Sequence, residues 1–297
     1  DADWIYNTLG IKERRIAEEN QATSDLAWKA GKAAIGDANL KVEDIDLIIL
    51  ATATPDRLSP STACFVQDKL AAYNAAAFDI AAVCSGFLFS MSVASQYIAS
   101  GVYRNVLVIG ADTFSKITDW KRRDAVFFGD GAGAAVLSYG NNDEGFLAHR
   151  IYSDGRGKYN FTVPAGGSEM PSCVDTVKKK LHFFQMNGGA VYDTGIEVLP
   201  KAINQVLLDT GLDINDIDFM IPHQPGIRIL KKTAEILGLP FEKVMTNMDK
   251  YANTSGGTIP ILLDELNKSK RLKKGDIVLF AAVGSGWTYG ASIIKWS

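Results

Sequence analysis

Phe78-Asp79-Ile80-Ala81-Ala82-Val83-Cys84-Ser85-Gly86-Phe87 is the stretch that decides how the rest of this sequence is interpreted. An apolar run gives way to small residues, and Phe87 begins a helical stretch that ends near Gly101. The stretch predicts a strand, a tight turn carrying Cys84, and a helix. Because backbone N–H groups at a helix start stabilise negative charge, we expect this thiol to have a lowered pKa. A buried structural cysteine is the alternative, since free cysteine packs as a small hydrophobic residue.

Length and composition restrict the class of protein. The 297 residues are 47% hydrophobic and 22% charged, which is typical of a globular protein with a sizeable core. The formal net charge of −3 argues against nucleic acid as a broad electrostatic partner. No signal peptide is visible and the apolar runs are too short to span a bilayer, so we expect no membrane segment. Cys64, Cys84 and Cys173 lack paired or metal-ligand spacing, which predicts a cytoplasmic protein with neither disulfides nor metal.

Predicted strands and helices alternate, as in mostly parallel sheets covered by helices. One helix is expected to begin with Thr23 or Ser24 as its cap. Its apolar side is formed by Leu26, Ala30, Ala33 and Ala34. The chain begins inside a predicted helix at 1–6, so we expect a preceding segment to be absent. The other expected elements are strands at 45–51 and 105–110, helices at about 60–70 and 87–101, and a glycine-rich turn at 127–133 entering a strand at 134–137.

The glycine-rich turn invites comparison with a nucleotide-binding loop. Such a loop follows a strand and opens a helix. Here the residues after the glycines, Ala134–Leu137, continue as a strand-like run instead. We therefore reject nucleotide binding and expect the glycines to allow close packing between layers.

The two halves of the sequence resemble each other. Ile45–Ile49 recurs as Ile217–Ile221, and Val106–Val108 recurs as Val278–Phe280, each 172 positions later. An equal offset at two distant places indicates an internal duplication.

The duplication predicts halves at 1–144 and 145–297. Stacked together, they would form a duplicated five-layered α/β/α/β/α body. The second half is expected to start with a strand at Gly145–Ser153, whose first-half counterpart would precede Asp1.

Three polar groups are expected at the carboxyl ends of strands, where chemistry gathers in such sheets. Cys84 follows one strand, His223 follows another, and Asn253 falls near the position 172 residues after Cys84. These three side chains form a workable nucleophilic set, with a thiolate and two neutral N–H donors. Taken singly, His223 is better explained as an interior histidine and Asn253 as a turn residue. Their joint placement favours a site.

Motifs in order along nearly the whole chain resemble the β-ketoacyl-acyl carrier protein synthase III family of thiolase-like condensing enzymes. They are Asp3-Trp4-Ile5, Gly10-Ile11-Lys12-Glu13-Arg14-Arg15-Ile16-Ala17, Ala82-Val83-Cys84-Ser85-Gly86-Phe87, Phe128-Gly129-Asp130-Gly131-Ala132-Gly133-Ala134, Pro222-His223-Gln224, Ala252-Asn253-Thr254-Ser255 and Gly284-Ser285-Gly286-Trp287-Thr288-Tyr289-Gly290. The resemblance implies a thiolase-like fold and a decarboxylative Claisen condensation. It implies CoA thioesters as substrates and no cofactor.

The resemblance also implies roles for the polar residues. Cys84 takes an acyl group from acyl-CoA, malonyl-acyl carrier protein loses CO₂, and the resulting carbanion attacks the acyl-enzyme. His223 and Asn253 donate hydrogen bonds to the malonyl thioester oxygen, where negative charge develops. The backbone N–H groups of Cys84 and Ser285 form the oxyanion hole of the acyl-transfer steps.

Further residues are implied to bind the substrates. Trp4 and Arg122 match positions that sandwich the CoA adenine, and Gly188 matches a glycine beside the pantetheine arm. Arg228, with Lys231 and Lys232 on the same helix, would meet the acidic carrier protein. The structural alternatives are a buried tryptophan, a helix-start glycine and a solvated helix face. The implied assembly is a homodimer.

Three departures from the family pattern leave the chemistry intact but bear on specificity. They are Thr8, the pair Pro225-Gly226, and Ser285. We expect Leu58, Phe87 and Phe114, together with a dimer mate, to shape the acyl pocket. Two alternatives follow: an acyltransferase or condensing enzyme of secondary metabolism with another acceptor, and a non-catalytic partner subunit. The intact Cys84, His223 and Asn253 argue against the second.

Overall fold

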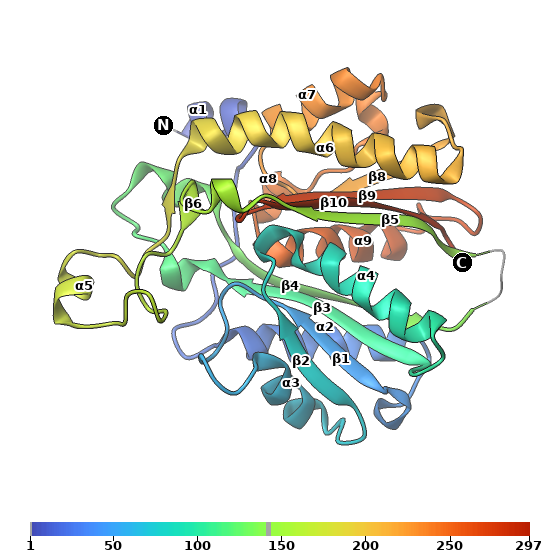
Figure 1. Ribbon diagram of the computed structural model, residues 1–297, viewed down its shortest axis with the longest axis horizontal. Coiled ribbons are helices and arrows are strands. Elements are labelled where there is room, and N and C mark those ends of the chain that lie inside the picture. Colours follow the sequence, from blue (N-terminus) through green and yellow to red (C-terminus); the bar gives the residue numbers. More distant parts are fainter. Residues whose placement is uncertain (1, 141–143) are drawn as a thin grey trace.

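The chain folds into two stacked four-stranded sheets, with helices outside and between them (Figure 1). The computed structural model describes residues 2–140 and 144–297. Asp1 of the predicted first helix and residues 141–143, beside the expected boundary between the halves, lie outside the described residues. The layers follow the order helix, sheet, helix, sheet, helix, which confirms the predicted α/β/α/β/α architecture.

The first sheet has the strand order β2-β1-β3-β4. β1 is parallel to β2 and β3, and β4 is antiparallel to β3. Alternate side chains of β1 reach opposite faces, so Ile48 packs under the outer helices while Ile49 faces the second sheet. The elements are β1 (Leu47–Ala51), β2 (Ala76–Ile80), β3 (Asn105–Thr113) and β4 (Asp130–Ser138), with the outer helices α2 (Thr23–Asp37) and α3 (Thr62–Leu70).

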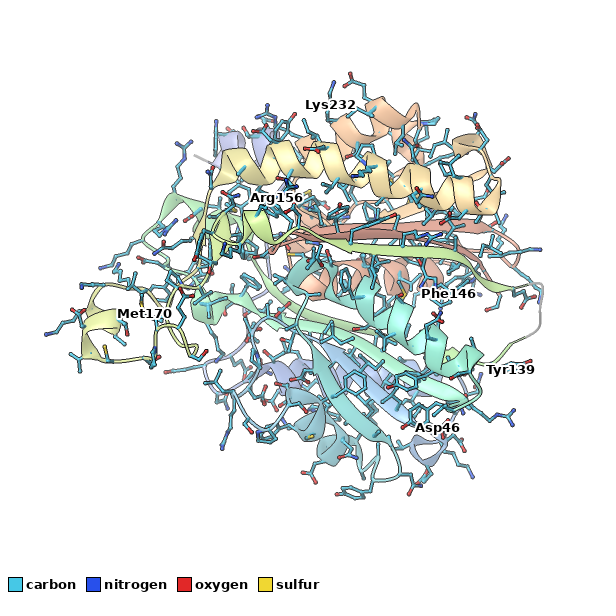
Figure 2. All side chains as sticks on the ribbon, viewed as in Figure 1. Asp46, Tyr139, Phe146, Arg156, Met170 and Lys232 are labelled. Carbon is cyan, nitrogen blue, oxygen red and sulfur yellow. The ribbon has the colours of Figure 1, made fainter. Side chains whose placement is uncertain are left out.

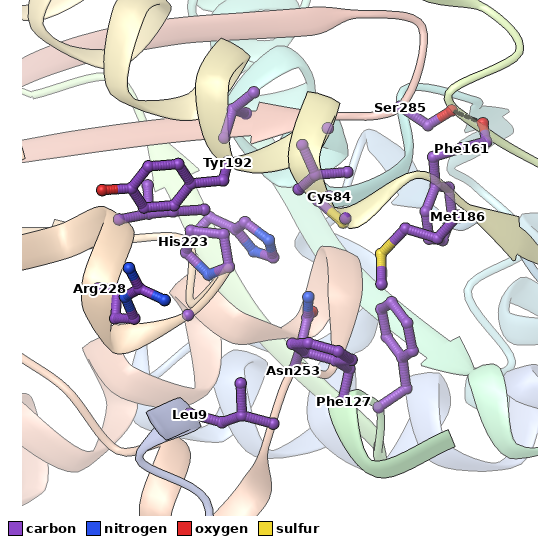
Figure 3. Close-up of a pocket in the computed structure, with 18 of the residues that line it drawn as sticks. Leu9, Cys84, Phe127, Phe161, Met186, Tyr192, His223, Arg228, Asn253 and Ser285 are labelled. Atoms are coloured by element: carbon purple, nitrogen blue, oxygen red, sulfur yellow. Dashed lines mark hydrogen bonds between the residues drawn. The ribbon is translucent and has the colours of Figure 1, made fainter. Parts of the chain in front are cut away.

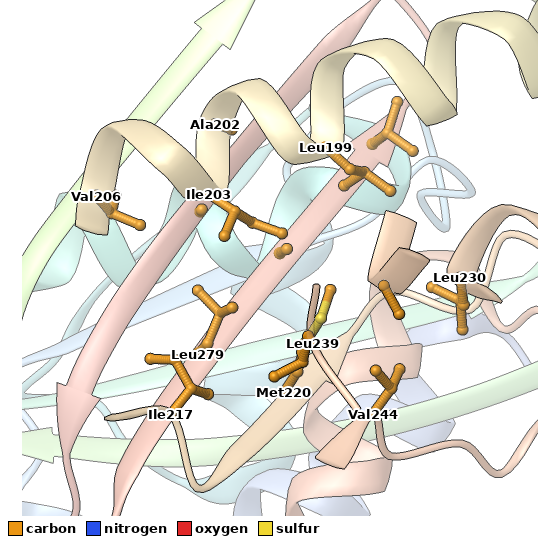
Figure 4. Close-up of a cluster of buried hydrophobic side chains, with 14 of the residues drawn as sticks. Leu199, Ala202, Ile203, Val206, Ile217, Met220, Leu230, Leu239, Val244 and Leu279 are labelled. Atoms are coloured by element: carbon orange, nitrogen blue, oxygen red, sulfur yellow. The ribbon is translucent and has the colours of Figure 1, made fainter. Parts of the chain in front are cut away.

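The second sheet has the order β5-β10-β9-β8 and is covered on its outer face by two helices. The expectation of a mostly parallel sheet is wrong for this half, because β10 follows β9 through a short turn and is antiparallel to both β9 and β5. Figure 4 shows Leu199 and Ile203 of the longer helix above Leu279 of the sheet, inside a large buried apolar cluster. The elements are β5 (Gly145–Ser153), β8 (Phe219–Pro222), β9 (Ile277–Gly284) and β10 (Thr288–Lys295), with α6 (Gly188–Thr210) and α7 (Ile227–Leu237). The predicted strand at Gly145–Ser153 is confirmed.

The central layer consists of α4 (Gly86–Ala99) and α9 (Thr258–Lys268). Its apolar side chains form one cluster with the inner faces of both sheets. Because both faces of each sheet are covered, the central strands β1, β3 and β9 are buried along almost their whole length. The layer also brings the N-terminal ends of α4 and α9 to the middle of the molecule.

The sheet register supports the internal duplication. Leu47 pairs with Val106 in the first sheet, and 172 positions later Phe219 pairs with Val278 in the second. β1 and β8 therefore occupy equivalent places, as do β3 and β9.

Two details of α2 differ from expectation. The cap position is Ala22, and its backbone N–H donates to the Asp25 carboxylate. Thr23 does not cap the helix, because its hydroxyl donates to the carbonyl of Thr54 instead. The buried side is also not the predicted one. Ala27, Gly31 and Ile35 face the sheet. A Cβ at Gly31 would lie 3.1 Å from the Leu107 side chain, so glycine there lets the helix approach the strands closely.

The glycine-rich segment was expected to be a turn as far as residue 133, which is wrong, since β4 already begins at Asp130. The proposed reason for its glycines is confirmed. A Cβ at Gly133 would lie 2.6 Å from the backbone nitrogen of Ile261, so only glycine lets α9 lie this close to β4.

In the second half, a long excursion of the chain connects β5 to α6. It contains β6 (Phe161–Thr162), β7 (Gln185–Met186) and the short helix α5 (Val174–Lys178), and it projects at the left of Figures 1 and 2, where Met170 is labelled. The remaining helices are α1 (Ala2–Leu9) and α8 (Met248–Tyr251). Across residues 2–140 and 144–297, none of the helices combines the length and apolar character needed to cross a membrane.

Candidate active site

Two equivalent sharp turns meet where the halves join. Val83–Ser85 forms a short 3₁₀ turn before α4, and Ser255–Gly257 forms the same turn before α9, again 172 positions later. Val83 and Ser255 both have left-handed backbone conformations, with φ of 47° and 52°, although neither is glycine. Such backbone conformations are uncommon for non-glycine residues and concentrate at functional sites. The first turn carries Cys84 as predicted.

The Cys84 thiol is buried and remains protonated at neutral pH. Its Sγ lies 3.7 Å from the hydroxyl of Ser255 in the opposing turn. Burial raises the pKa of the Cys84 thiol to about 12, an effect that the Ser255 hydrogen bond opposes and the Asp112 carboxyl adds to. The expected lowering of this pKa is therefore wrong, because removal from water outweighs the favourable position at a helix start.

His223 lies directly after β8 and is buried and neutral. Burial lowers the pKa of His223 to about 3. Its Nδ1 is 2.8 Å from the Thr258 hydroxyl, which also lies 2.9 Å from the Ser255 carbonyl. When that hydroxyl donates to Nδ1, Nε2 carries the ring proton and is a donor; when it donates to the carbonyl, Nε2 is an acceptor.

Asn253 has its side-chain amide oriented by its own turn. Its Oδ1 accepts the backbone N–H of Ser255 at 2.8 Å, which leaves the NH₂ group to donate elsewhere. Its backbone is held by the carbonyl of Phe127 and the N–H of Gly129, each at 3.0 Å. The conspicuous glycine-rich motif thus anchors a site residue from the other half.

These three side chains come from different elements and meet in one cavity of about 390 Å³ (Figure 3). The structure therefore brings together Cys84, His223 and Asn253, as the sequence predicted. Thr8, Gly188, Arg228 and the Pro225-Gly226 pair also line this cavity. Its other walls are mostly apolar, with Phe128, Phe161, Met186, Tyr192 and Trp287 among them.

Gly284 and Ser285 border the cavity beside Cys84. A Cβ at Gly284 would lie 3.0 Å from the backbone nitrogens of Cys84 and Ser85. Glycine therefore keeps the approach to the Cys84 N–H open. The Ser285 hydroxyl is turned away and donates to the Phe161 carbonyl at 2.5 Å, so its side chain ties down the excursion.

A second cavity adjoins the first and contains the residues implied to bind CoA. Trp4, Arg122 and Gly188 all line it. The cation above the Trp4 ring is Arg123, at 4.4 Å, whereas Arg122 forms a bidentate pair with Asp124. We did not predict from the sequence that Arg123 contacts Trp4, although Arg123 is the basic residue directly after Arg122.

The predicted basic patch lies on α7, at the top of Figure 2, where Lys232 is labelled. Arg228 stands over the Tyr192 ring at 5.4 Å, at the edge of the main cavity, and Lys231 is exposed. Lys232 pairs with Glu235 at 2.7 Å, which reduces its share in the patch.

The expected acyl-pocket residues need correction. Within the described residues, Leu58 is exposed and Phe87 is buried in the central layer, and neither lines the cavity. Phe114 stacks on Phe128 at 4.6 Å between ring centroids, so it supports the wall from behind.

Sequence reasoning missed three polar residues of the site. They are Ser255 and Thr258, which contact Cys84 and His223, and Asp112 at the end of β3. The duplication was an available signal, because Asp112 and Gly284 are 172 positions apart and occupy equivalent strand ends.

Comparison with known proteins identifies the family. Residues 78–155 match the family described as 3-oxoacyl-[acyl-carrier-protein (ACP)] synthase III, and residues 207–296 match its C-terminal region. The β-ketoacyl-[acyl-carrier-protein] synthase III of Caldanaerobacter subterraneus subsp. tengcongensis is 50% identical over 99% of this chain and 89% of its own length. The chain belongs to the β-ketoacyl-acyl carrier protein synthase III family.

Other synthase III proteins support the assignment. That of Clostridioides difficile is 48% identical over 99% of this chain and 90% of its own length. The crystal structure of 3-oxoacyl-[acyl-carrier-protein] synthase III from Aquifex aeolicus has a TM-score of 0.92 at 39% identity, covering 100% of this chain and 91% of that one. The family is one of condensing acyltransferases, so the predicted thiolase-like fold and enzyme class are confirmed. Among the described side chains, no group of three or more His, Cys, Asp or Glu residues could hold a metal ion.

Proposed function

We propose that this protein condenses an acyl group from acyl-CoA with malonyl-acyl carrier protein, releasing CO₂ and giving 3-oxoacyl-acyl carrier protein, as the first condensation of fatty acid synthesis. The observation that carries the proposal is the meeting of Cys84, His223 and Asn253 at one apolar cavity. A nucleophilic thiol and two N–H donors are what a ping-pong acyl transfer followed by an enolate step requires.

The internal duplication supports an oxyanion hole at the Cys84 N–H. In the second turn, the backbone N–H of Gly256 donates to the Asp112 carboxylate at 3.0 Å. Cys84 is the equivalent of Gly256, and Gly284 is the equivalent of Asp112, with no side chain in the carboxylate's place. An anionic oxygen of the substrate can therefore occupy beside Cys84 the position that a carboxylate oxygen occupies beside Gly256. The N–H of Ser285 is proposed as the second donor.

His223 and Asn253 are proposed to serve the decarboxylation. The fixed NH₂ group of Asn253 and Nε2 of a neutral His223 are both able to donate to the malonyl thioester oxygen. Donors in a water-poor site stabilise the developing enolate more strongly than water does. The Thr258 hydroxyl selects the required tautomer when it donates to Nδ1.

The outer residues are assigned to substrate binding. We propose that the adenine of CoA stacks on Trp4, with Arg123 replacing or joining Arg122, and that the pantetheine arm passes Gly188 into the cavity. Arg228 and Lys231 are proposed to meet the acidic carrier protein at the cavity mouth.

We further propose a homodimer, assembled through the free edge of β2. Among residues 2–140 and 144–297, β2 is paired along one side only, with β1, and its residues 77–80 are half-buried. The halves 1–144 and 145–297 are proposed to divide the work, with acyl transfer at the first and enolate stabilisation at the second. The free cysteines favour a reducing cytoplasm.

The proposal is tested by incubating the protein with a panel of acyl-CoAs, recording intact mass, and then adding malonyl-acyl carrier protein. The expected result is an acyl adduct on Cys84 that is consumed with release of CO₂ and formation of 3-oxoacyl-carrier protein. Acyl transfer to an oxygen or nitrogen acceptor without CO₂ would replace the proposal with the acyltransferase alternative.

A further inference from the structure

Asp112 is a fully buried carboxyl that the condensation chemistry leaves without a role. It lies at the end of β3, at the centre of the molecule, and its relative exposure is 0%. Its Oδ1 accepts four hydrogen bonds from the loop after β1, from the hydroxyls of Thr52 and Thr54 and the backbone N–H groups of Ala53 and Thr54, at 2.8–3.1 Å. All these donors are neutral, so no cation compensates the buried charge.

The other carboxyl oxygen faces the active site. Oδ2 accepts the backbone N–H of Gly256 at 3.0 Å, and the Ser255 hydroxyl lies close enough to this carboxyl to lower its pKa. Burial raises the pKa of Asp112 above its usual value, but its hydrogen-bond partners, which are all donors, oppose this shift and favour the ionised form. Ser255 is the one partner on the active-site side whose hydrogen can be exchanged, since its hydroxyl both donates and accepts.

The Ser255 hydroxyl links Asp112 to the nucleophile. With its hydrogen directed to the carboxylate, its lone pairs face the Cys84 thiol, which donates to it across 3.7 Å. The chain of contacts therefore runs from thiol to hydroxyl to carboxylate. A thiol held protonated must lose its proton as it attacks, because the thiolate is the nucleophile.

We propose that Ser255 is a further catalytic residue, which accepts the Cys84 proton while passing its own to Oδ2 of Asp112, and that Asp112 holds this proton for as long as Cys84 carries the acyl group. The S–H bond of Cys84 and the O–H bond of Ser255 break, and new O–H bonds form on Ser255 and Asp112. The electron pair of the broken S–H bond stays on the Cys84 sulfur and forms the bond to the acyl carbon. The CoA thiolate departs with the electrons of the broken thioester bond.

The same path returns the proton after condensation. When Cys84 leaves the product as a thiolate, Asp112 gives its proton to Ser255, and Ser255 gives its own to sulfur. One buried negative charge thus moves from the carboxylate to the sulfur and back. Protonated Oδ2 keeps a lone pair for the Gly256 N–H, so the exchange leaves every other contact of Asp112 in place.

This inference rests on the proposed role of Cys84 and makes a stoichiometric prediction. At pH 7 the departing CoA thiolate, with an ordinary thiol pKa of about 8.5, takes a proton from solvent. Since the Cys84 proton stays on Asp112, formation of acyl-enzyme consumes close to one solvent proton per acyl group. If the Cys84 proton instead went to CoA, no net uptake would occur.

The experiment mixes stoichiometric enzyme and acyl-CoA in weak buffer with a pH indicator, beside intact mass and peptide mapping of the acyl group. Ser255→Ala is expected to acylate on the order of 10²-fold more slowly and without proton uptake. Thr52→Val is the matched control, because it removes a hydrogen bond to Asp112 off the path and keeps the uptake. Asp112→Asn is expected to abolish uptake if it folds, and Ser255→Ala decides the matter if it does not.

The outcomes separate the two proposals. An acyl group mapped to a residue other than Cys84 would overturn the active-site assignment and the relay with it. Acylation of Cys84 without proton uptake, or with the same uptake in Ser255→Ala, would overturn the relay alone.

Discussion

Replacing Gly284 with alanine tests the oxyanion hole through a single methyl group. The new Cβ would lie 3.0 Å from the nitrogens of Cys84 and Ser85 and 3.1 Å from Oγ1 of Thr288. A hydrogen-bonded oxygen sits about 2.9 Å from its donor nitrogen, so the methyl group would occupy the proposed place of the oxyanion. The substitution therefore removes the Cys84 N–H as a donor while leaving all titratable side chains unchanged.

The expected magnitude follows from the loss of one donor. Removing one oxyanion-hole donor lowers the rate on the order of 10²–10³-fold, about 2.7–4 kcal/mol of transition-state stabilisation. The neighbouring atoms must also move by a few tenths of an ångström, and overpacking of this kind lowers the free energy of unfolding by about 1–3 kcal/mol. As long as the variant remains folded, this loss of stability does not lower the rate of acyl-enzyme formation, so a rate on the order of 10²–10³-fold slower reports the lost donor.

The assay is the time course of acyl-enzyme formation by intact mass, beside thermal unfolding of the same sample. Gly36→Ala is the matched control, since Gly36 is exposed in α2 and its added Cβ would meet no atom within 4 Å. A folded Gly284→Ala variant that acylates at the wild-type rate would refute the oxyanion hole at this position.

Two further predictions concern charge. Stability should fall on both sides of neutral pH, at up to about 1.4 kcal/mol per pH unit. On the acid side, burial depresses the pKa of His223 from 6.5 to about 3, so stability is lost as the pH drops below 6.5. On the alkaline side, burial raises the pKa of Cys84 from 9 to about 12, so stability declines as the pH rises from 9 towards 12. Urea unfolding should show the alkaline decline in Cys64→Ala but not in Cys84→Ala, and an identical decline in both would contradict the assignment. Arg228→Glu should slow the reaction with malonyl-carrier protein about tenfold at low salt while acylation by acyl-CoA changes little, compared with Lys32→Glu on the distant α2. Equal losses in both half-reactions would mean that Arg228 binds CoA or supports the fold.

The fold and the three central site residues were accessible from sequence because the duplication is visible in it. The offset of 172 positions fixes equivalent strands and places Cys84 and Asn253 in matching turns. Because site residues such as Cys84 and His223 directly follow strands, the order and direction of the strands are enough to place them close together. The register of both sheets reproduces that offset, which is why the placement was correct.

Properties set by burial and by long-range contacts could not be predicted in the same way. The Cys84 pKa depends on how completely the opposing turn excludes water, which no local pattern encodes. The prediction that Thr23 caps its helix was wrong, because the Thr23 hydroxyl donates to the carbonyl of Thr54, which is distant in sequence. The sequence pattern also does not show that Asp124 pairs with Arg122 while Arg123 lies over the Trp4 ring.

The central claim is that Cys84 accepts the acyl group while His223 and Asn253 stabilise the enolate. Its most direct test is the release of labelled CO₂ from malonyl-acyl carrier protein beside labelled acyl-enzyme formation, in Cys84→Ala, His223→Ala and Asn253→Ala. We expect Cys84→Ala to form no acyl-enzyme yet retain decarboxylation. The other two variants should still acylate but lose decarboxylation on the order of 10²–10³-fold. Wild-type rates of CO₂ release in His223→Ala and Asn253→Ala would contradict the account.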